Sequence, residues 1–199
     1  VILAYFDLLG IKHTSAPFYQ MALTFNKRDT LWNVNLNVPA RSLKGILLLF
    51  EEPSAKFNRD SEKFYNPKIT KVEVTIEGIP NQLYSHGLHP HQMWDETRKL
   101  FAAGNKREPE AGMVAKDLAL ADVSLGEFLT DKYSLWLDLR TTCDDRLHGS
   151  GRRIENASEG VTIQISKKAE TAGALNMYLY ILQDAQLNIE NGRFLRAIY

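Results

Sequence analysis

The chain has 199 residues, 44% of them hydrophobic and 24% charged, which is ordinary for one globular domain that buries its own core. Basic and acidic side chains both number 24. The resulting zero net charge argues against a general binder of nucleic acid or membrane surfaces, because both require an excess of basic residues. The single cysteine, Cys143, excludes an internal disulfide framework and favours a reducing compartment.

The first segment, VILAYFDLLG, is not typical of a signal peptide, because an aspartate interrupts its apolar run and no basic residues precede it. No apolar run in the chain approaches the roughly 20 residues that a membrane helix needs, so we expect no membrane span. The first residue is Val1 rather than methionine. We therefore expect the chain to be cut from a longer polypeptide.

Strand patterns follow from residue 18 onward. Side chains in WNVNLNV (32–38) and KVEVTIE (71–77) alternate between apolar and polar, which is typical of strands with one buried face. GILLLF (45–50) and NMYLYIL (176–182) are apolar on both faces, as expected of strands covered on both sides. FYQMALTF (18–25) is a further candidate strand.

The middle of the chain has a helical pattern. Met93, Trp94, Thr97, Leu100 and Phe101 recur at three- and four-residue spacing before Gly104. The segment 113–133 predicts one or two short helices, and Ser124 with Glu127 has the spacing of a capping box. We interpret residues 86–133 as a helical insertion between two strands of one domain.

The chain ends in sheet. SLWLDL (134–139), VTIQIS (161–166), NMYLYIL (176–182), AQLNIE (185–190) and RFLRAIY (193–199) all have strand patterns. Asn191-Gly192 between the last two predicts a two-residue hairpin, since both residues accept positive φ. Roughly eight or nine strands with antiparallel patterning predict an all-β sandwich or barrel.

Three histidines in HGLHPHQ, namely His86, His89 and His91, are the strongest candidates for a metal site of the cupin type. Gly87 and Pro90 interrupt their spacing, and no HExxH motif or cysteine pair supplies further ligands. We interpret the cluster as solvated loop histidines.

The remaining candidates for chemistry are isolated. Cys143, Asp144, Asp145 and His148 lie close in sequence, but nothing indicates a nucleophile–base pair or an oxyanion site. LHGSGRR (147–153) lacks phosphate-loop spacing, and the mixed charges of residues 56–68 dilute a nucleic-acid groove. Asn156 begins a formal glycosylation sequon that we expect to stay unmodified. We therefore predict no catalytic, metal or cofactor-binding residues and no enzyme.

Four stretches carry a family resemblance: PARSLKGILLLFEE, FYNPKITKVEVTIEGIPNQLY, LHGSGRRIENASEGVTIQI and NMYLYILQDAQLNIENGRFLRAIY. They resemble the C-terminal jelly roll of double jelly-roll major capsid proteins of the Polinton/Maverick and adintovirus kind. These proteins are related to the capsid proteins of nucleocytoplasmic large DNA viruses. The resemblance covers about residues 32–199.

The resemblance implies a structural virion protein. In this family two jelly rolls stand side by side, and three copies form a pseudo-hexameric capsomer of an icosahedral shell. Residues 1–199 then form one roll, with 1–26 as a connector or the end of a preceding roll. The implied partners are copies of the chain in a homotrimer, neighbouring capsomers, and penton and minor capsid proteins, without sequence-specific nucleic-acid contact. The implied location is the virion capsid, assembled inside the host cell.

Two other functions stay open at this point. A carbohydrate- or ligand-binding jelly roll requires exposed Trp or Tyr on a concave face, whereas Trp32, Trp94 and Trp136 lie on apolar faces or in a helix. A cupin-like metalloenzyme requires the three histidines as ligands. Tyr178 and Tyr180 share one face of their strand and are candidates for contacts between subunits, or for simple core packing.

Overall fold

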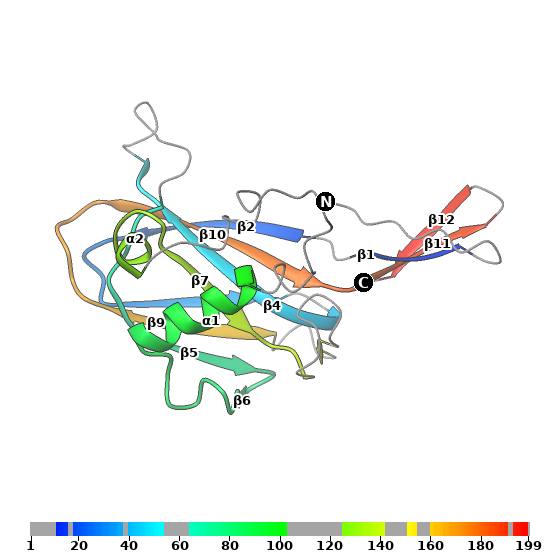
Figure 1. Ribbon diagram of the computed structural model, residues 1–199, viewed down its shortest axis with the longest axis horizontal. Helices are drawn as coiled ribbons and strands as arrows, with labels where there is room; N and C mark the ends of the chain where they lie inside the picture. Colours follow the sequence, from blue (N-terminus) through cyan, green and yellow to red (C-terminus); the bar gives the residue numbers. More distant parts are fainter. Residues whose placement is uncertain are drawn as a thin grey trace, which may run out of the picture.

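The computed structural model describes residues 11–15, 18–37, 40–53, 64–102, 125–141, 151–154, 160–190 and 193–198. Within these ranges it contains twelve strands and two helices. Figure 1 shows the strands of two facing sheets, with the helix Pro90–Ala102 packed beside the strands Ile69–Ile76 and Ser134–Asp138.

The first sheet has the order β2-β10-β4-β7, all antiparallel. Its strands are β2 (Phe18–Asn26), β10 (Ala174–Gln183), β4 (Ala40–Glu51) and β7 (Ser134–Asp138). A short strand, β8 (Arg152–Ile154), also pairs with β4. The predicted strands at 18–25, 45–50, 134–139 and 176–182 therefore all lie in this one sheet.

The second sheet has the order β3-β9-β5-β6, also antiparallel. Its strands are β3 (Leu31–Leu36), β9 (Val161–Lys167), β5 (Ile69–Ile76) and β6 (Ile79–Pro80). Glu77 and Gly78 form the tight turn between β5 and β6 with φ of 50° and 77°, the left-handed values that a type I′ hairpin requires. Two facing sheets with the strand orders β2-β10-β4-β7 and β3-β9-β5-β6 form a jelly roll, which confirms the predicted fold class.

The last two strands do not join this sandwich. β11 (Ala185–Glu190) pairs with β12 (Arg193–Ile198) and with β1 (Ile11–Ser15) in a separate three-stranded sheet. The register ends at the pair Glu190–Arg193, which confirms the predicted hairpin, although Asn191 and Gly192 themselves lie outside the described residues. Alternation within AQLNIE and RFLRAIY indicates strands but does not say which sheet they enter.

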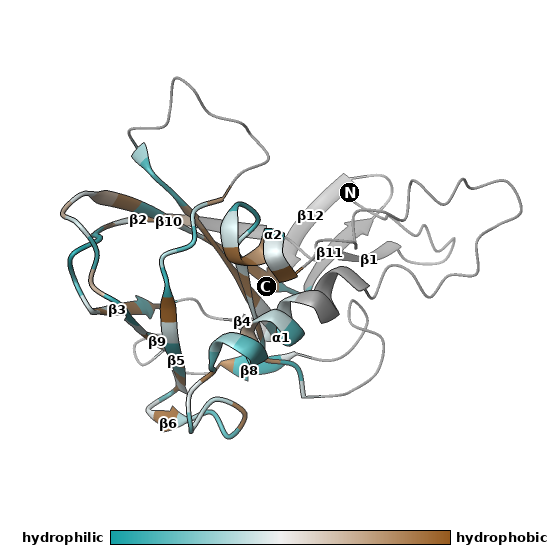
Figure 2. Ribbon diagram, turned by 60° about the vertical axis from the view of Figure 1, so that its left-hand side comes forward, coloured by the Kyte–Doolittle hydropathy of each residue, from teal (hydrophilic) through white to brown (hydrophobic). Residues whose placement is uncertain are grey.

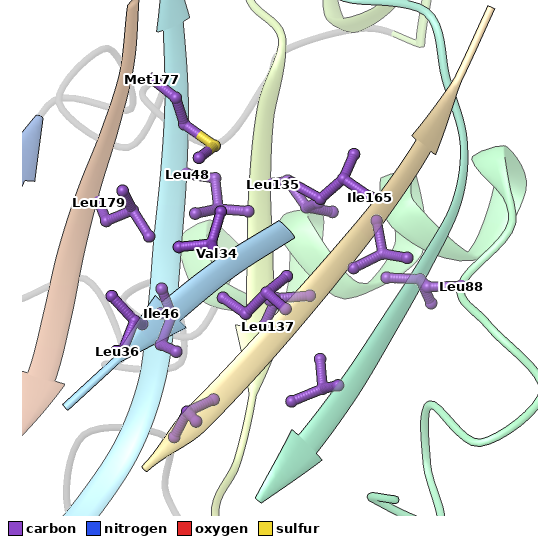
Figure 3. Packing of buried hydrophobic residues seen from close by; sticks show 14 of the residues in the cluster. Val34, Leu36, Ile46, Leu48, Leu88, Leu135, Leu137, Ile165, Met177 and Leu179 are labelled. Atoms are coloured by element: carbon purple, nitrogen blue, oxygen red, sulfur yellow. The ribbon is translucent and has the colours of Figure 1, made fainter. Parts of the chain in front are cut away.

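The core lies between the inner faces of the two sheets. Alternate residues of β3, β4, β9 and β10 are fully buried, as their period-two patterns predict. Figure 3 shows apolar side chains from both sheets filling the layer between them: Val34, Leu36, Ile46, Leu48, Leu135, Leu137, Ile165, Met177 and Leu179.

A chain of aromatic rings connects this core to the helical insertion. Ring centroids lie 5.0 Å apart for Phe25–Trp32, 6.2 Å for Trp32–Phe50 and 5.9 Å for Phe50–Tyr133. Phe128 lies 5.0 Å beyond Tyr133, and the ring of Trp94 lies 5.1 Å beyond Phe128. Such spacings are typical of favourable aromatic pairs.

The insertion contains α1 (Pro90–Ala102) and α2 (Leu125–Thr130). Met93, Thr97 and Phe128 are buried, which agrees with the predicted helical face, whereas the side chains of Leu100 and Phe101 lie outside the described residues. Figure 2 shows that the described part of α1 is mostly hydrophilic, whereas β4 is largely hydrophobic. Within the described ranges, neither helix has the length and apolar character to cross a membrane.

Candidate assembly surfaces

Of the three clustered histidines, His89 and His91 lie at the start of α1, and His86 lies in the turn before it. His86, His89 and His91 are all exposed. The His89 N–H donates to Gln92 Oε1 at 3.1 Å, and the His89 carbonyl accepts the first helical bond from Met93, which makes His89 the N-cap of α1. No group of three His, Cys, Asp or Glu side chains that could hold a metal ion occurs in the described part of the chain.

Several other candidates lie outside the described residues. These are Cys143, Asp144, Asp145 and His148, together with the sequon at Asn156 and the capping residue Ser124. Of the charged segment 56–68, only residues 64–68 are described. Their predicted roles stay predictions.

A buried ammonium group joins two loops at one end of the sandwich. The Lys167 side chain has no exposed surface, and its Nζ donates to the carbonyl oxygens of Lys27 at 2.6 Å and Lys168 at 2.7 Å. The Asp29 carbonyl lies 3.4 Å away, and the ring of Trp32 lies below at 5.2 Å. One cation thereby satisfies acceptors from the β2–β3 and β9–β10 connections.

Glu170 completes this arrangement. Its Oε1 accepts from the Tyr65 hydroxyl at 2.9 Å and lies 3.0 Å from Lys68 Nζ, while its Oε2 lies 3.6 Å from Lys167 Nζ. Lys27 is ion-paired with Glu52 and lies over the Tyr65 ring. We call these six residues, Lys27, Glu52, Tyr65, Lys68, Lys167 and Glu170, the loop-end cluster.

The pKa values in the loop-end cluster follow its burial. Desolvation lowers the pKa of Lys167, although the carboxylate of Glu170 opposes the shift. Burial by itself raises the pKa of Glu170, but the hydrogen bonds from Lys68 and Tyr65 outweigh it and hold that pKa below its ordinary value. Burial and the bond to Glu170 raise the pKa of Tyr65. The loop-end cluster therefore joins charged and hydrogen-bonded side chains from the connections at one end of the sandwich.

Two side-chain hydroxyls block the free edge of β7. The Leu139 N–H bonds to the Lys44 carbonyl of β4, so by strand alternation Ser134, Trp136 and Asp138 direct their backbone groups away from β4. Thr97 of α1 accepts from the Trp136 N–H at 3.1 Å and donates to the Ser134 carbonyl at 3.1 Å.

The Tyr84 hydroxyl pairs with backbone groups of β7 in the same way, at Asp138. It accepts from the Asp138 N–H at 2.7 Å and donates to the Asp138 carbonyl at 3.2 Å. Tyr84 is fully buried, and burial raises the pKa of its hydroxyl, which therefore stays protonated and able to donate. An edge strand with unpaired backbone is a template for another chain, and the insertion removes this template at β7.

A second ion pair holds the chain where it leaves β10. Lys44 Nζ lies 2.7 Å from Asp184 Oδ1, and the Lys44 side chain is only 4% exposed. The Ser42 hydroxyl donates to Asp184 Oδ2 at 2.7 Å and accepts from the Gly151 N–H at 2.9 Å. This small network fixes the end of β10 against β4 and the approach to β8.

The outer face of the first sheet is apolar and half-exposed. Tyr178 and Tyr180 of β10 lie opposite Leu49 and Leu47 of β4, and all four are partly accessible. Trp136 is covered more completely and lies over Gly45, where an added Cβ would come within 2.3 Å of the indole ring. The expectation that β4 and β10 are covered on both sides is therefore correct for their inner faces only.

A small apolar pocket lies between the helices and the start of β5. Its volume is about 200 Å³, and it is lined mainly by Ile69, Pro90, Met93, Phe128, Leu129 and Tyr133, with Lys68 and Lys168 also at the wall. Ligand sites for small molecules usually exceed about 300 Å³ and present convergent polar groups. This pocket has neither property, so it supports no substrate.

The sequence reasoning missed Lys167, although a signal was present. Lys167 continues the alternation of Val161, Ile163 and Ile165, which places it on the buried face of β9. A lysine at an inward position requires acceptors, and they come from residues about 140 positions away. Thr97 and Tyr84 carried no comparable signal, because their partners lie in β7.

Comparison with known proteins adds information on the fold alone. No family model and no curated protein matches the sequence. Among solved structures, the Faustovirus major capsid protein matches with a TM-score of 0.62 at 11% identity, over 94% of this chain and 35% of that one. Two PBCV-1 capsid structures match over 95–96% of this chain and 52% of theirs, with TM-scores of 0.55 and 0.51 at 12% identity.

The fold is therefore the jelly roll of the double jelly-roll major capsid proteins, as the sequence resemblance implied. The chain spans about a third to a half of the length of the capsid proteins that it matches.

Proposed function

We propose that this chain is one jelly roll, the C-terminal one, of a major capsid protein that assembles as homotrimers into an icosahedral shell. The observation that carries the proposal is the likeness to the Faustovirus capsid protein over 94% of the chain, together with the two-sheet strand order that defines the roll. In this proposal the protein resides in the virion, and its partners are its own copies, neighbouring capsomers and penton and minor capsid proteins.

The described surfaces support a structural role. A shell subunit requires a stiff body and flat contact faces, and the loop-end cluster stiffens the connections at one end of the sandwich. The half-exposed face of Leu47, Leu49, Tyr178 and Tyr180 offers apolar area with hydroxyl groups, a composition favoured in interfaces. We propose this face as a contact between jelly rolls within the capsomer.

The two alternatives receive less support. None of the three tryptophans is exposed, since Trp32 and Trp136 are buried and Trp94 is half-buried. None of them is therefore available to stack against a carbohydrate. The three histidines are exposed, with His89 and His91 at the start of α1 and His86 in the turn before it, which disfavours a cupin-like metalloenzyme. We accordingly propose a protein without catalytic activity.

The test is the mass of the native assembly. The longest polypeptide that contains this chain should be expressed, purified and measured by size-exclusion chromatography with multi-angle light scattering. The proposal expects a stable particle with three times the mass of the polypeptide. A monomer that persists at tens of micromolar would refute the trimer, and stoichiometric zinc, iron or manganese in the purified protein would refute the non-enzymatic role.

A further inference from the structure

The two outer edges of the first sheet differ. Thr97 and Tyr84 satisfy the free backbone groups of β7 at one edge, whereas at the other edge β2 is paired only with β10. Among the described residues, bonds to the outer side of β2 occur only at its end, where the Asn26 carbonyl accepts from the Asp29 N–H at 3.1 Å and from Trp32 Nε1 at 3.4 Å. Within the described part of the chain, the jelly roll is thus closed at one edge of this sheet and open at the other.

The residues of β2 that face outward follow from the register. The Lys27 N–H donates to the Gly173 carbonyl at 2.8 Å, and these two residues continue the pairing of β2 with β10. In an antiparallel ladder, alternate residues bond to the same neighbour. The odd-numbered residues of β2 therefore bond to β10, and Gln20, Ala22 and Thr24 direct their N–H and C=O groups to the open edge.

This edge lacks the usual protections against strand addition. Edge strands are normally short, bulged, charged or interrupted by proline. β2 is nine residues long, its register with β10 has no shift, and its sequence FYQMALTFN contains no charge and no proline. Met21, Leu23 and Phe25 on its inner face are only half-buried, so a strand added beside them would complete their burial.

We propose that this open edge pairs with β2 of a second copy of the chain, antiparallel and about a twofold axis at Ala22. Full overlap of Phe18–Asn26 with itself places Ala22 opposite Ala22 and Gln20 opposite Thr24. An uncharged strand meets its own copy without like-charge repulsion, and the chain as a whole carries no net charge. The first sheets of the two copies then form one continuous sheet across the interface.

The inference rests on the proposed function in one respect, because a shell requires contacts between copies beyond those inside a trimer. A twofold contact joins two subunits without closing a ring of three, so it suits a junction between capsomers. The β3 edge is a poorer candidate. It has six residues, and its outward positions include Asn33 and Asn35, a residue type that is depleted in strands.

Disulfide cross-linking tests the pairing directly. On a Cys143→Ser background, Ala22→Cys places two thiols across the axis, where directly opposed, hydrogen-bonded residues have Cα atoms about 5.5 Å apart. A disulfide spans about 4.4–6.8 Å between Cα atoms, so a covalent dimer should form under mild oxidation. The matched control is Ala169→Cys, at an exposed loop position, which should stay monomeric on a reducing-agent-free gel.

A charge placed on the edge supplies the converse test. Ala22→Lys sets two ammonium groups against each other at the axis and should weaken dimerisation about tenfold in sedimentation velocity, which corresponds to ~1.4 kcal/mol. Ala169→Lys should leave the association unchanged. Circular dichroism and thermal melting, unchanged in both variants, show that the fold is intact.

The outcomes separate the inference from the proposed function. Trimers that form while Ala22→Cys cross-links no faster than Ala169→Cys overturn the β2 pairing and leave the capsid proposal standing. Cross-linked dimers without any trimer overturn the capsid proposal and support the pairing. Cross-linking through Asn35→Cys in place of Ala22→Cys moves the interface to β3 and also overturns the inference.

Discussion

Replacement of Lys167 by methionine tests whether the loop-end cluster holds the end of the sandwich. Methionine preserves most of the buried side-chain length but removes the ammonium group that donates to the Lys27 and Lys168 carbonyls. Each hydrogen bond to a charged group contributes about 1.5–3 kcal/mol to stability, and two of them are lost. Removal of a buried charge also removes its desolvation cost, which offsets part of this loss. The carboxylate of Glu170 keeps Lys68 and Tyr65 as partners. We therefore expect a net loss of about 3 kcal/mol.

Urea denaturation followed by tryptophan fluorescence measures this loss. Thermal melting gives a second measure: for a domain of 150–250 residues, a loss of 1 kcal/mol lowers the melting temperature by about 2–4 °C, so Lys167→Met should lower it by about 6–12 °C. Lys168→Met is the matched control, because the neighbouring side chain is exposed and should change stability by less than about 0.5 kcal/mol. Equal effects of the two substitutions, or a gain in stability from Lys167→Met, would refute the role assigned to the buried cation.

Three further substitutions probe other parts of the structure. Tyr84→Phe leaves the Asp138 backbone unpaired at the β7 edge and should lower the free energy of unfolding by about 1–3 kcal/mol in chemical denaturation. The control Tyr180→Phe, on the half-exposed outer face, should change it little, and comparable losses in the two variants would argue against edge protection. Gly45→Ala places a Cβ against the indole ring of Trp136 and should lower the free energy of unfolding by about 1–3 kcal/mol, measured by thermal melting. In the control Gly173→Ala, the new Cβ meets only the flexible end of the Lys27 side chain at 3.1 Å. Equal melting temperatures for the two variants would contradict the packing of Trp136 over Gly45. Glu170 has a pKa below its ordinary 4.5, so the folded state releases this proton more readily than the unfolded state. The contribution of Glu170 to the free energy of unfolding is complete above about pH 4.5 and disappears as pH falls through the lowered pKa. Glu170→Gln should therefore flatten the acid side of the curve of stability against pH. Parallel curves for the variant and the wild type would exclude this linkage.

Much of the fold follows from local patterns. The alternation in WNVNLNV places Trp32, Val34 and Leu36 on one face, and all three are buried in β3. The same reasoning holds for β5 and β9, because one face of each is set by side chains two residues apart. The start of α1 at Pro90 and the hairpin at 190–193 likewise depend on residues that are neighbours in sequence.

Long-range features were less accessible. The pairing of β2 with β10 joins residues about 150 positions apart, and alternation does not specify such partners. For the same reason the sequence did not reveal that AQLNIE and RFLRAIY leave the sandwich for a separate sheet with β1. The hydroxyls of Thr97 and Tyr84 acquire their role only when the insertion folds against β7.

The central claim is that the faces and edges of a jelly roll, rather than a reactive cleft, perform the function of this protein. Electron microscopy of the purified, longest polypeptide tests that claim most directly. Class averages should show flat particles with threefold symmetry and a near-hexagonal outline that tile into curved sheets at high concentration. Isolated single subunits under all conditions of concentration and salt would contradict the claim.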